Sequence, residues 1–292
     1  MPAAYLSTKS LICLSGKDAQ DFLQSLITTD IDSLPENEAR PGALLTPQGK
    51  ILFDFLIWRD GDGFLIETEA GQRDALMRRL TMYKLRAAVE IAAGTEDGVT
   101  VFWGEDTGRA VVKDAAFEKA GITLTRAPGK QADEPEQPYH ALRIEAGVSA
   151  SGHDYALQDA FPHDVLLDKT GGLSFRKGCY VGQEVVSRMQ HRGTARRRVA
   201  LVSGSAALPA SGTEIVAGGK PVGALGTVAG NKGLAIVRTD RVGDALARGL
   251  ALTAGDMTVA VTLPEWAGLA FPIEASVDAP AGASVGSQEA ET

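Results

Sequence analysis

The sequence predicts an α+β protein that ends in a small antiparallel β-barrel. Between residues 11 and 103, apolar runs of strand length alternate with helical segments and hairpin turns. This order is typical of α+β layers and not of a doubly wound parallel sheet. From Arg198 onward, short apolar runs are separated by glycines, as in small antiparallel barrels. Because 292 residues exceed the usual size of one domain, two packed units or one large unit are expected.

The first part of the chain carries regular signals for secondary structure. Apolar residues spaced three and four apart mark helices, and strand-length apolar runs that stop at Gly, Pro or Asp mark strands and turns. Ser15 and Asp18 resemble a weak capping box before the first helix. In order, we expect a strand at 11–14, a helix at 19–26, strands at 51–58 and 64–66 joined by a hairpin turn at 60–63, a helix at 72–84, and strands at 89–91 and 99–103.

Shifts in composition suggest where the domains divide. Segment 127–138 is polar and marked by prolines, which is typical of a linker, and residues 139–146 after it are expected to form a strand or a short helix. The sequence therefore predicts an α+β core at 1–194 with this internal linker, a β-barrel at 195–274 and a disordered tail at 275–292.

The overall composition excludes several classes of protein. Hydrophobic residues make up 44% of the chain and charged residues 23%, so a disordered or fibrous protein is excluded. A net charge of −8 argues against general attraction to nucleic acid or to an anionic membrane. No apolar stretch reaches the ~18–20 residues of a membrane span, and the first ten residues do not resemble a signal peptide. We therefore expect a cytoplasmic protein with no membrane partner.

The chain has two cysteines, Cys13 and Cys179, and four histidines. This number is too small for a disulfide framework, and the spacing excludes a CxxC-type zinc or iron–sulfur site within one chain. The histidines show no metal-binding spacing, so no metal ligand is assigned. Reduced thiols are expected.

Positive charge is concentrated in one segment. Between Arg176 and Arg198, seven Lys or Arg residues stand against one acidic residue, Glu184, while the rest of the chain holds 22 basic and 36 acidic residues. A charge run of this kind is also consistent with a plain solvated surface. The glycines and the cysteine inside the segment favour a functional interpretation.

Cys179 is the candidate reactive group of this segment. Gly178 and Gly182 permit a tight turn around it, and the pattern from Gln183 onward predicts a helix. A position just before a helix N-terminus and two residues from Lys177 favours the thiolate form. The alternative is that Cys179 is a small buried residue, an explanation that suits Cys13 within its apolar run.

The residues Lys177-Gly178-Cys179-Tyr180-Val181-Gly182-Gln183-Glu184, followed by Arg188, resemble the K-G-C-[Y/F]-x-G-Q-E signature of the YgfZ family. Segments 16–30 and 142–154 resemble two further motifs of that family, G-x-D-A-x-x-F-L…T-x-D and L-R-x-E-x-G…G-x-D. The resemblance covers roughly residues 8–265. It implies folate-binding proteins of iron–sulfur cluster assembly and repair, related to the aminomethyltransferase (T-protein) of the glycine cleavage system. The implied fold is a GcvT-like ring of two intertwined α+β domains around a central folate channel, with a C-terminal β-barrel.

The resemblance also implies site residues. Glu145 matches a glutamate that binds the pteridine ring in T-proteins, with Arg143 beside it; the alternative for these two is a salt-bridged strand face. Arg188, Arg192 or Lys177 is expected to anchor the glutamate carboxylates of the folate. The full candidate set is Cys179 and Lys177 as catalytic residues, and Glu145, Arg143, Gly178, Tyr180, Gly182, Gln183, Glu184 and Arg188 as residues that bind tetrahydrofolate.

Three functions follow from these observations. The first is a folate-binding accessory protein that works with iron–sulfur client or assembly proteins. The second is a folate-dependent aminomethyltransferase or demethylase; the stretch 66–71 lacks the Asn that precedes the T-protein aspartate, which argues against glycine cleavage. The third is a tRNA-binding or tRNA-modification module, suggested by the run Arg196-Arg197-Arg198, although the negative net charge argues against nucleic acid as a partner.

Overall fold

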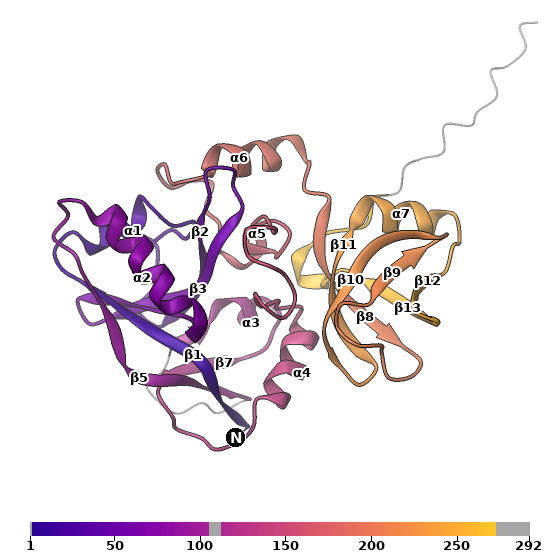
Figure 1. Ribbon diagram of the computed structural model, residues 1–292, viewed down its shortest axis with the longest axis horizontal. Helices are drawn as coiled ribbons and strands as arrows, with labels where there is room; N and C mark the ends of the chain where they lie inside the picture. Colours follow the sequence, from indigo (N-terminus) through magenta and orange to yellow (C-terminus); the bar gives the residue numbers. More distant parts are fainter. Residues whose placement is uncertain (1, 105–111, 273–292) are drawn as a thin grey trace, which may run out of the picture.

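The strands of the protein form two closed β-barrels, seen at the left and the right of Figure 1. The computed structural model describes residues 2–104 and 112–272. The first barrel has the strand order β1-β4-β3-β2-β6-β7-β5. Its strands are β1 (Ala3–Ser15), β2 (Glu38–Leu45), β3 (Ile51–Asp60), β4 (Gly63–Glu69), β5 (Glu90–Trp103), β6 (Val112–Asp114) and β7 (Leu124–Pro128).

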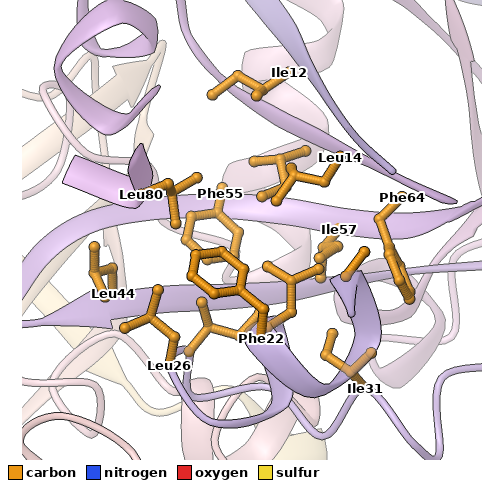
Figure 2. Close-up of a cluster of buried hydrophobic side chains, with 14 of the residues drawn as sticks. Ile12, Leu14, Phe22, Leu26, Ile31, Leu44, Phe55, Ile57, Phe64 and Leu80 are labelled. Atoms are coloured by element: carbon orange, nitrogen blue, oxygen red, sulfur yellow. The ribbon is translucent and has the colours of Figure 1, made fainter. Parts of the chain in front are cut away.

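Helices cover the first barrel and join it to the second. The early helices are α1 (Ala19–Gln24), α2 (Ala70–Lys84) and α3 (Ala115–Lys119), and the later ones are α4 (Gln137–Ala146), α5 (Leu167–Thr170) and α6 (Gln183–Arg192). Figure 2 shows how Phe22 of α1 and Leu80 of α2 meet Phe55 and Ile57 of β3 in one apolar cluster. Burial of these side chains is the main driving force that holds the helices on the barrel.

The second barrel begins after α6. Its strand order is β10-β11-β8-β13-β12-β9, with all pairs antiparallel. The elements are β8 (Arg197–Gly204), β9 (Glu214–Ala217), β10 (Lys220–Ala229), β11 (Lys232–Arg238), α7 (Thr239–Ala247), β12 (Leu252–Ala254), β13 (Met257–Thr262) and the 3₁₀ turn η1 (Glu265–Ala267). The predicted C-terminal antiparallel barrel is thus confirmed. The expected tail at 275–292 lies outside the described residues.

Several sequence predictions need correction. The strands expected at 89–91 and 99–103 are one long strand, β5, whose pairing with β1 contains register shifts that let it bend. The capping box is not formed, because the Asp18 carboxylate accepts a hydrogen bond from Ala88 N instead of capping α1. Residues 139–146 form a helix, α4, which decides between the two alternatives. The linker expected at 127–138 is shorter, because β7 and α4 occupy its ends.

The helix α4 lies between the two barrels (Figure 1). Arg143 on α4 is 2% exposed; it pairs with Asp154 (2.8 Å) and donates a hydrogen bond to the Thr227 hydroxyl on β10 (2.8 Å). Trp266 Nε1 donates to Ala146 O at the end of the same helix. These contacts fix the second barrel against the first. Among the described residues, no helix is both long and apolar enough to cross a membrane.

Candidate functional site: an acceptor-rich cavity and a separate thiol loop

A cavity lies inside the N-terminal unit, where β3 and β4 face α4 and the segment 148–155. Its empty volume is about 680 Å³, a value that includes open solvent at its mouth. Charged side chains from several strands line it together with the backbone of Pro41 and Gly42 on β2. The cavity is therefore polar and accessible from solvent.

A buried network around Arg126 forms one wall of the cavity. Arg126 on β7 donates to Glu67 Oε1 (2.6 Å), to Asp114 Oδ2 (2.8 Å) and to the Tyr139 hydroxyl (2.8 Å). Burial opposes the charged guanidinium, but the two carboxylates outweigh it and hold the pKa of Arg126 well above its ordinary value. Glu67 is 2% exposed, and its second oxygen, Oε2, has no hydrogen-bond partner. This oxygen is an unsatisfied acceptor in the wall of the cavity.

A second carboxylate, Asp54 on β3, lines the same cavity. It accepts hydrogen bonds from the Ser151 hydroxyl and from the Tyr155 hydroxyl, each at 2.6 Å. Burial and the neighbouring Asp54 raise the pKa of Tyr155 well above its ordinary value, so the phenol remains a donor. Gln72 donates to Ser151 Oγ (3.1 Å), which directs the single Ser151 hydrogen toward Asp54. Asp54 is therefore held in place as an acceptor.

The structure separates Arg143 from Glu145. Arg143 lines the cavity, whereas Glu145 is exposed and is absent from the lining. Residues two apart in a helix point in different directions, so both cannot face one ligand. The cavity therefore does not bring Glu145 together with Arg143, and the role of Glu145 toward a folate stays a prediction. The strand-face alternative is wrong because the segment is helical. The carboxylate residues that line the cavity are Asp54, Glu67, Glu69 and Asp114.

The loop 177–182, which carries the first part of the sequence motif and is called the motif loop below, lies outside this cavity. It is on the surface beside the segment 27–30. Cys179 is exposed and its thiol is free. Lys177, by contrast, is only 8% exposed, and its Nζ donates to the carbonyl oxygens of Ile27 and Thr29, both at 2.7 Å. Burial lowers the pKa of Lys177 to about 8, although Asp30 and Asp32 act in the opposite direction. Lys177 therefore ties the loop down, and its ammonium does not reach the cavity.

The helix predicted after the loop is confirmed as α6, and it begins with Gly182 in the left-handed region at φ 79°. A Cβ at this position would meet the Thr46 carbonyl oxygen at 2.5 Å, so only glycine fits. Gly178 has open space around it. Tyr180 is buried against the core, and its backbone N–H donates to the Gln183 side chain (3.3 Å). These contacts give the loop a defined shape.

The motif residues Lys177, Gly178, Cys179, Tyr180, Gly182, Gln183, Glu184 and Arg188 are all absent from the lining of the cavity. The sequence predicted one site that includes them and Arg143, but in the structure they lie outside the cavity that Arg143 lines. Glu184 and Arg188 form an exposed i,i+4 pair (3.7 Å) on α6. Two of the three consecutive arginines are also engaged internally: Arg197 pairs with Asp159, and the buried Arg198 pairs with Asp168.

Glu67, Asp54 and Arg126 are not among the candidate residues that the sequence predicted. The sequence does contain a signal for the two carboxylates, because Asp54 and Glu67 lie within or directly after apolar runs of two strands. A carboxylate buried at such a position needs a hydrogen-bond or ion-pair partner. Within the described residues, no group of three or more His, Cys, Asp or Glu side chains is arranged to hold a metal ion.

Comparison with known proteins connects this architecture to others. Residues 196–269 match the family described as CAF17, C-terminal beta-barrel domain. A mitochondrial iron-sulfur cluster assembly factor IBA57 homolog of Pyricularia oryzae is 33% identical over 219 residues, which cover 66% of this chain and 55% of that protein. The chain thus spans little more than half the length of that relative, and the same holds for the homolog of Chaetomium globosum at 54%.

Other relatives are covered more fully. The tRNA-modifying protein YgfZ of Shigella boydii serotype 4 is 30% identical over 240 residues, covering 70% of this chain and 73% of that protein. Mitochondrial IBA57 of Mus musculus is 28% identical, with 89% and 84% covered. Because the IBA57 relatives are named as mitochondrial, the expected cytoplasmic location stays a prediction.

The fold itself has a solved counterpart. The glycine cleavage system aminomethyltransferase T of Bartonella henselae superposes with a TM-score of 0.66 at 15% identity, covering 89% of this chain and 84% of that chain. This likeness confirms the predicted GcvT-like fold and says nothing about activity. Together with the barrel match and the YgfZ and IBA57 relatives, it shows that the chain belongs to the CAF17/IBA57/YgfZ family.

Proposed function

We propose that this protein is a folate-binding accessory factor of iron–sulfur cluster assembly or repair, in which the cavity binds the folate and Cys179 acts on the cluster. The observation that carries the proposal is Glu67, a residue that lines the cavity and whose buried Oε2 has no partner in the protein. The names of the IBA57 relatives support the iron–sulfur half of the proposal.

A pterin ring fits the donor and acceptor set of the cavity. Its amino group and ring N–H are adjacent donors, and the Glu67 carboxylate, which pairs with Arg126, is a suitable acceptor for them. Asp54, oriented by Ser151 and Tyr155, offers a second acceptor. In this proposal Glu67 and Asp54 hold the ring. Tetrahydrofolate, when bound, supplies the N5 and N10 nitrogens that carry one-carbon units.

The cluster is a cargo in this proposal and not a resident group. Both cysteines are free, and the described residues contain no ready-made metal site. A thiolate binds iron readily, and Cys179 is exposed on a loop that Lys177 and Gly182 hold in shape. A partner that brings the remaining ligands can therefore reach this thiol without unfolding of the loop.

The test is complementation of a strain that lacks this protein with Cys179→Ser, using Cys13→Ser on β1 as the matched control. We expect cluster-dependent enzymes to lose activity under oxidative stress with the first variant and to keep it with the second. Full activity with Cys179→Ser would contradict the role of the thiol. Titration of purified protein with tetrahydrofolate tests the other half, and absence of binding would contradict it.

A folate-dependent one-carbon transferase is the second candidate, because Asp54 places an oriented carboxylate in the same cavity. Incubation with methylated or aminomethylated donors and tetrahydrofolate separates the two functions. Formation of methylene- or methyl-tetrahydrofolate at many turnovers would favour the transferase, and binding without turnover favours the accessory role.

A further inference from the structure

We infer that the cavity recognises the pterin headgroup alone and gives the glutamate tail of a folate no cationic partner. Reduced pterins without a tail should then bind about as well as folates. This inference rests on the proposed function and names the ligand class of the same site. It differs from the expectation that Lys177, Arg188 or Arg192 anchors the tail.

The cations in the cavity wall are all engaged by internal carboxylates. Lys9 pairs with Glu69 (2.5 Å) and Arg126 pairs with Glu67 and Asp114. The third cation, Arg143, is paired with an aspartate of the following loop (2.8 Å) and donates to two further acceptors. Among the described residues that line the cavity, no cation remains for the carboxylate of a ligand.

The acceptors, by contrast, exceed the donors. Asp54 receives only neutral hydroxyl donors, and Glu67 Oε2 receives none. A buried wall with excess carboxylates attracts N–H groups and repels a second carboxylate, and low dielectric strengthens both effects. A reduced pterin presents more N–H groups than an oxidised one, since its ring nitrogens carry hydrogens. The glutamate tail carries only negative charge and is expected to stay outside the cavity.

The basic segment 176–198 does not supply the cavity with a cation for the glutamate tail. Arg188 and Arg192 are exposed on α6, and neither lines the cavity. Lys177 directs its ammonium at the Ile27 and Thr29 carbonyls. In Figure 1, α6 lies at the top of the view and α4 at the bottom.

The test uses wild-type protein under anaerobic conditions and measures dissociation constants by calorimetry. The ligands are tetrahydrofolate, its triglutamate, tetrahydrobiopterin and p-aminobenzoylglutamate. We expect the first three to bind within about threefold of one another and the fourth not to bind. A hydrogen bond to a charged group contributes roughly tenfold or more in affinity, so an anchored tail would separate the ligands by at least that factor.

Tenfold tighter binding of the triglutamate, or tenfold weaker binding of tetrahydrobiopterin, would overturn the inference while the proposed function stands. Binding of none of the pterins would overturn the proposed function and the inference with it. Glu67→Gln should weaken the binding of all three pterin ligands by the same factor. Glu145→Gln and Arg188→Ala change exposed residues and should leave every affinity unchanged. The melting temperature of each variant verifies that it folds, and the ligand series on wild-type protein decides the matter without any variant.

Discussion

Replacement of Arg143 by Met is expected to loosen the contact between the two barrels. The guanidinium is 2% exposed and donates to Val148 O, Asp154 Oδ2 and Thr227 Oγ1, so it joins α4, the following loop and β10. Methionine fills similar space and removes the charge. The buried Asp154 carboxylate then keeps only the backbone N–H donors of Ala150 and Thr227.

The magnitude follows from the burial of the pair. Loss of one partner of a buried ion pair costs about 3–5 kcal/mol in the free energy of unfolding, because the remaining charge is uncompensated. Because two backbone N–H groups still donate to Asp154 in the variant, we expect a loss in the free energy of unfolding at the lower end of this range, about 3 kcal/mol. For a chain of this size the melting temperature should fall by roughly 5 °C.

Urea unfolding measured by circular dichroism and by tryptophan fluorescence tests this prediction, since Trp266 lies at the same contact. The matched control is Arg188→Met, whose exposed pair with Glu184 contributes about 0.5 kcal/mol or less. Burial tends to raise the pKa of Asp154, but Arg143 and the Thr227 N–H lower it overall. Its contribution to stability is therefore present above pH 3.8 and lost as the pH falls through the lowered value, a step the variant should lack. A loss below about 1 kcal/mol would refute the argument.

Three further predictions concern the motif loop and its support. Lys177→Met should raise the rate at which Cys179 reacts with a thiol reagent several-fold, because two hydrogen bonds that tie down the loop are lost; an unchanged rate would show that Lys177 does not hold it. Gly182→Ala should cost about 2 kcal/mol or more in urea unfolding, since its Cβ would meet a carbonyl oxygen at 2.5 Å, whereas Gly178→Ala should be almost neutral. Burial lowers the pKa of His163, so the unfolded chain binds a proton more readily and stability should decline as the pH falls below 6.5; His163→Gln should flatten that decline.

The elements that the sequence predicted best have strong local signals. The helix α6 follows from apolar spacing, and Gly182 marks its start because only glycine tolerates that backbone conformation. The second barrel follows from short apolar runs between glycines. Both depend on neighbours within a few positions of the chain, which one sequence contains in full.

The candidate site was harder to predict, because its parts come from distant segments. Segment 139–146 was open to two interpretations, and its helical form is what turns Glu145 outward while Arg143 points inward. Glu67 and Asp54 meet in one cavity only because β3 and β4 pair side by side with Leu56 opposite Glu67. No local pattern contains that register.

The cavity and the thiol loop are separate places that share one connecting segment. Lys177 Nζ donates to Thr29 O, the Thr29 hydroxyl donates to Pro41 O (2.9 Å), and Pro41 lines the cavity. Such a chain of contacts is not evidence of coupling by itself. We expect tetrahydrofolate to slow the labelling of Cys179. A ligand that restrains Pro41 should also restrain Thr29 and Lys177, which are linked to Pro41 by these hydrogen bonds. If tetrahydrofolate also weakens the equilibrium binding of a reversible thiol ligand at Cys179, that ligand must weaken tetrahydrofolate binding by the same factor, because coupling between two binding events is reciprocal. Labelling that is indifferent to folate would mean that the two halves of the proposed function act independently.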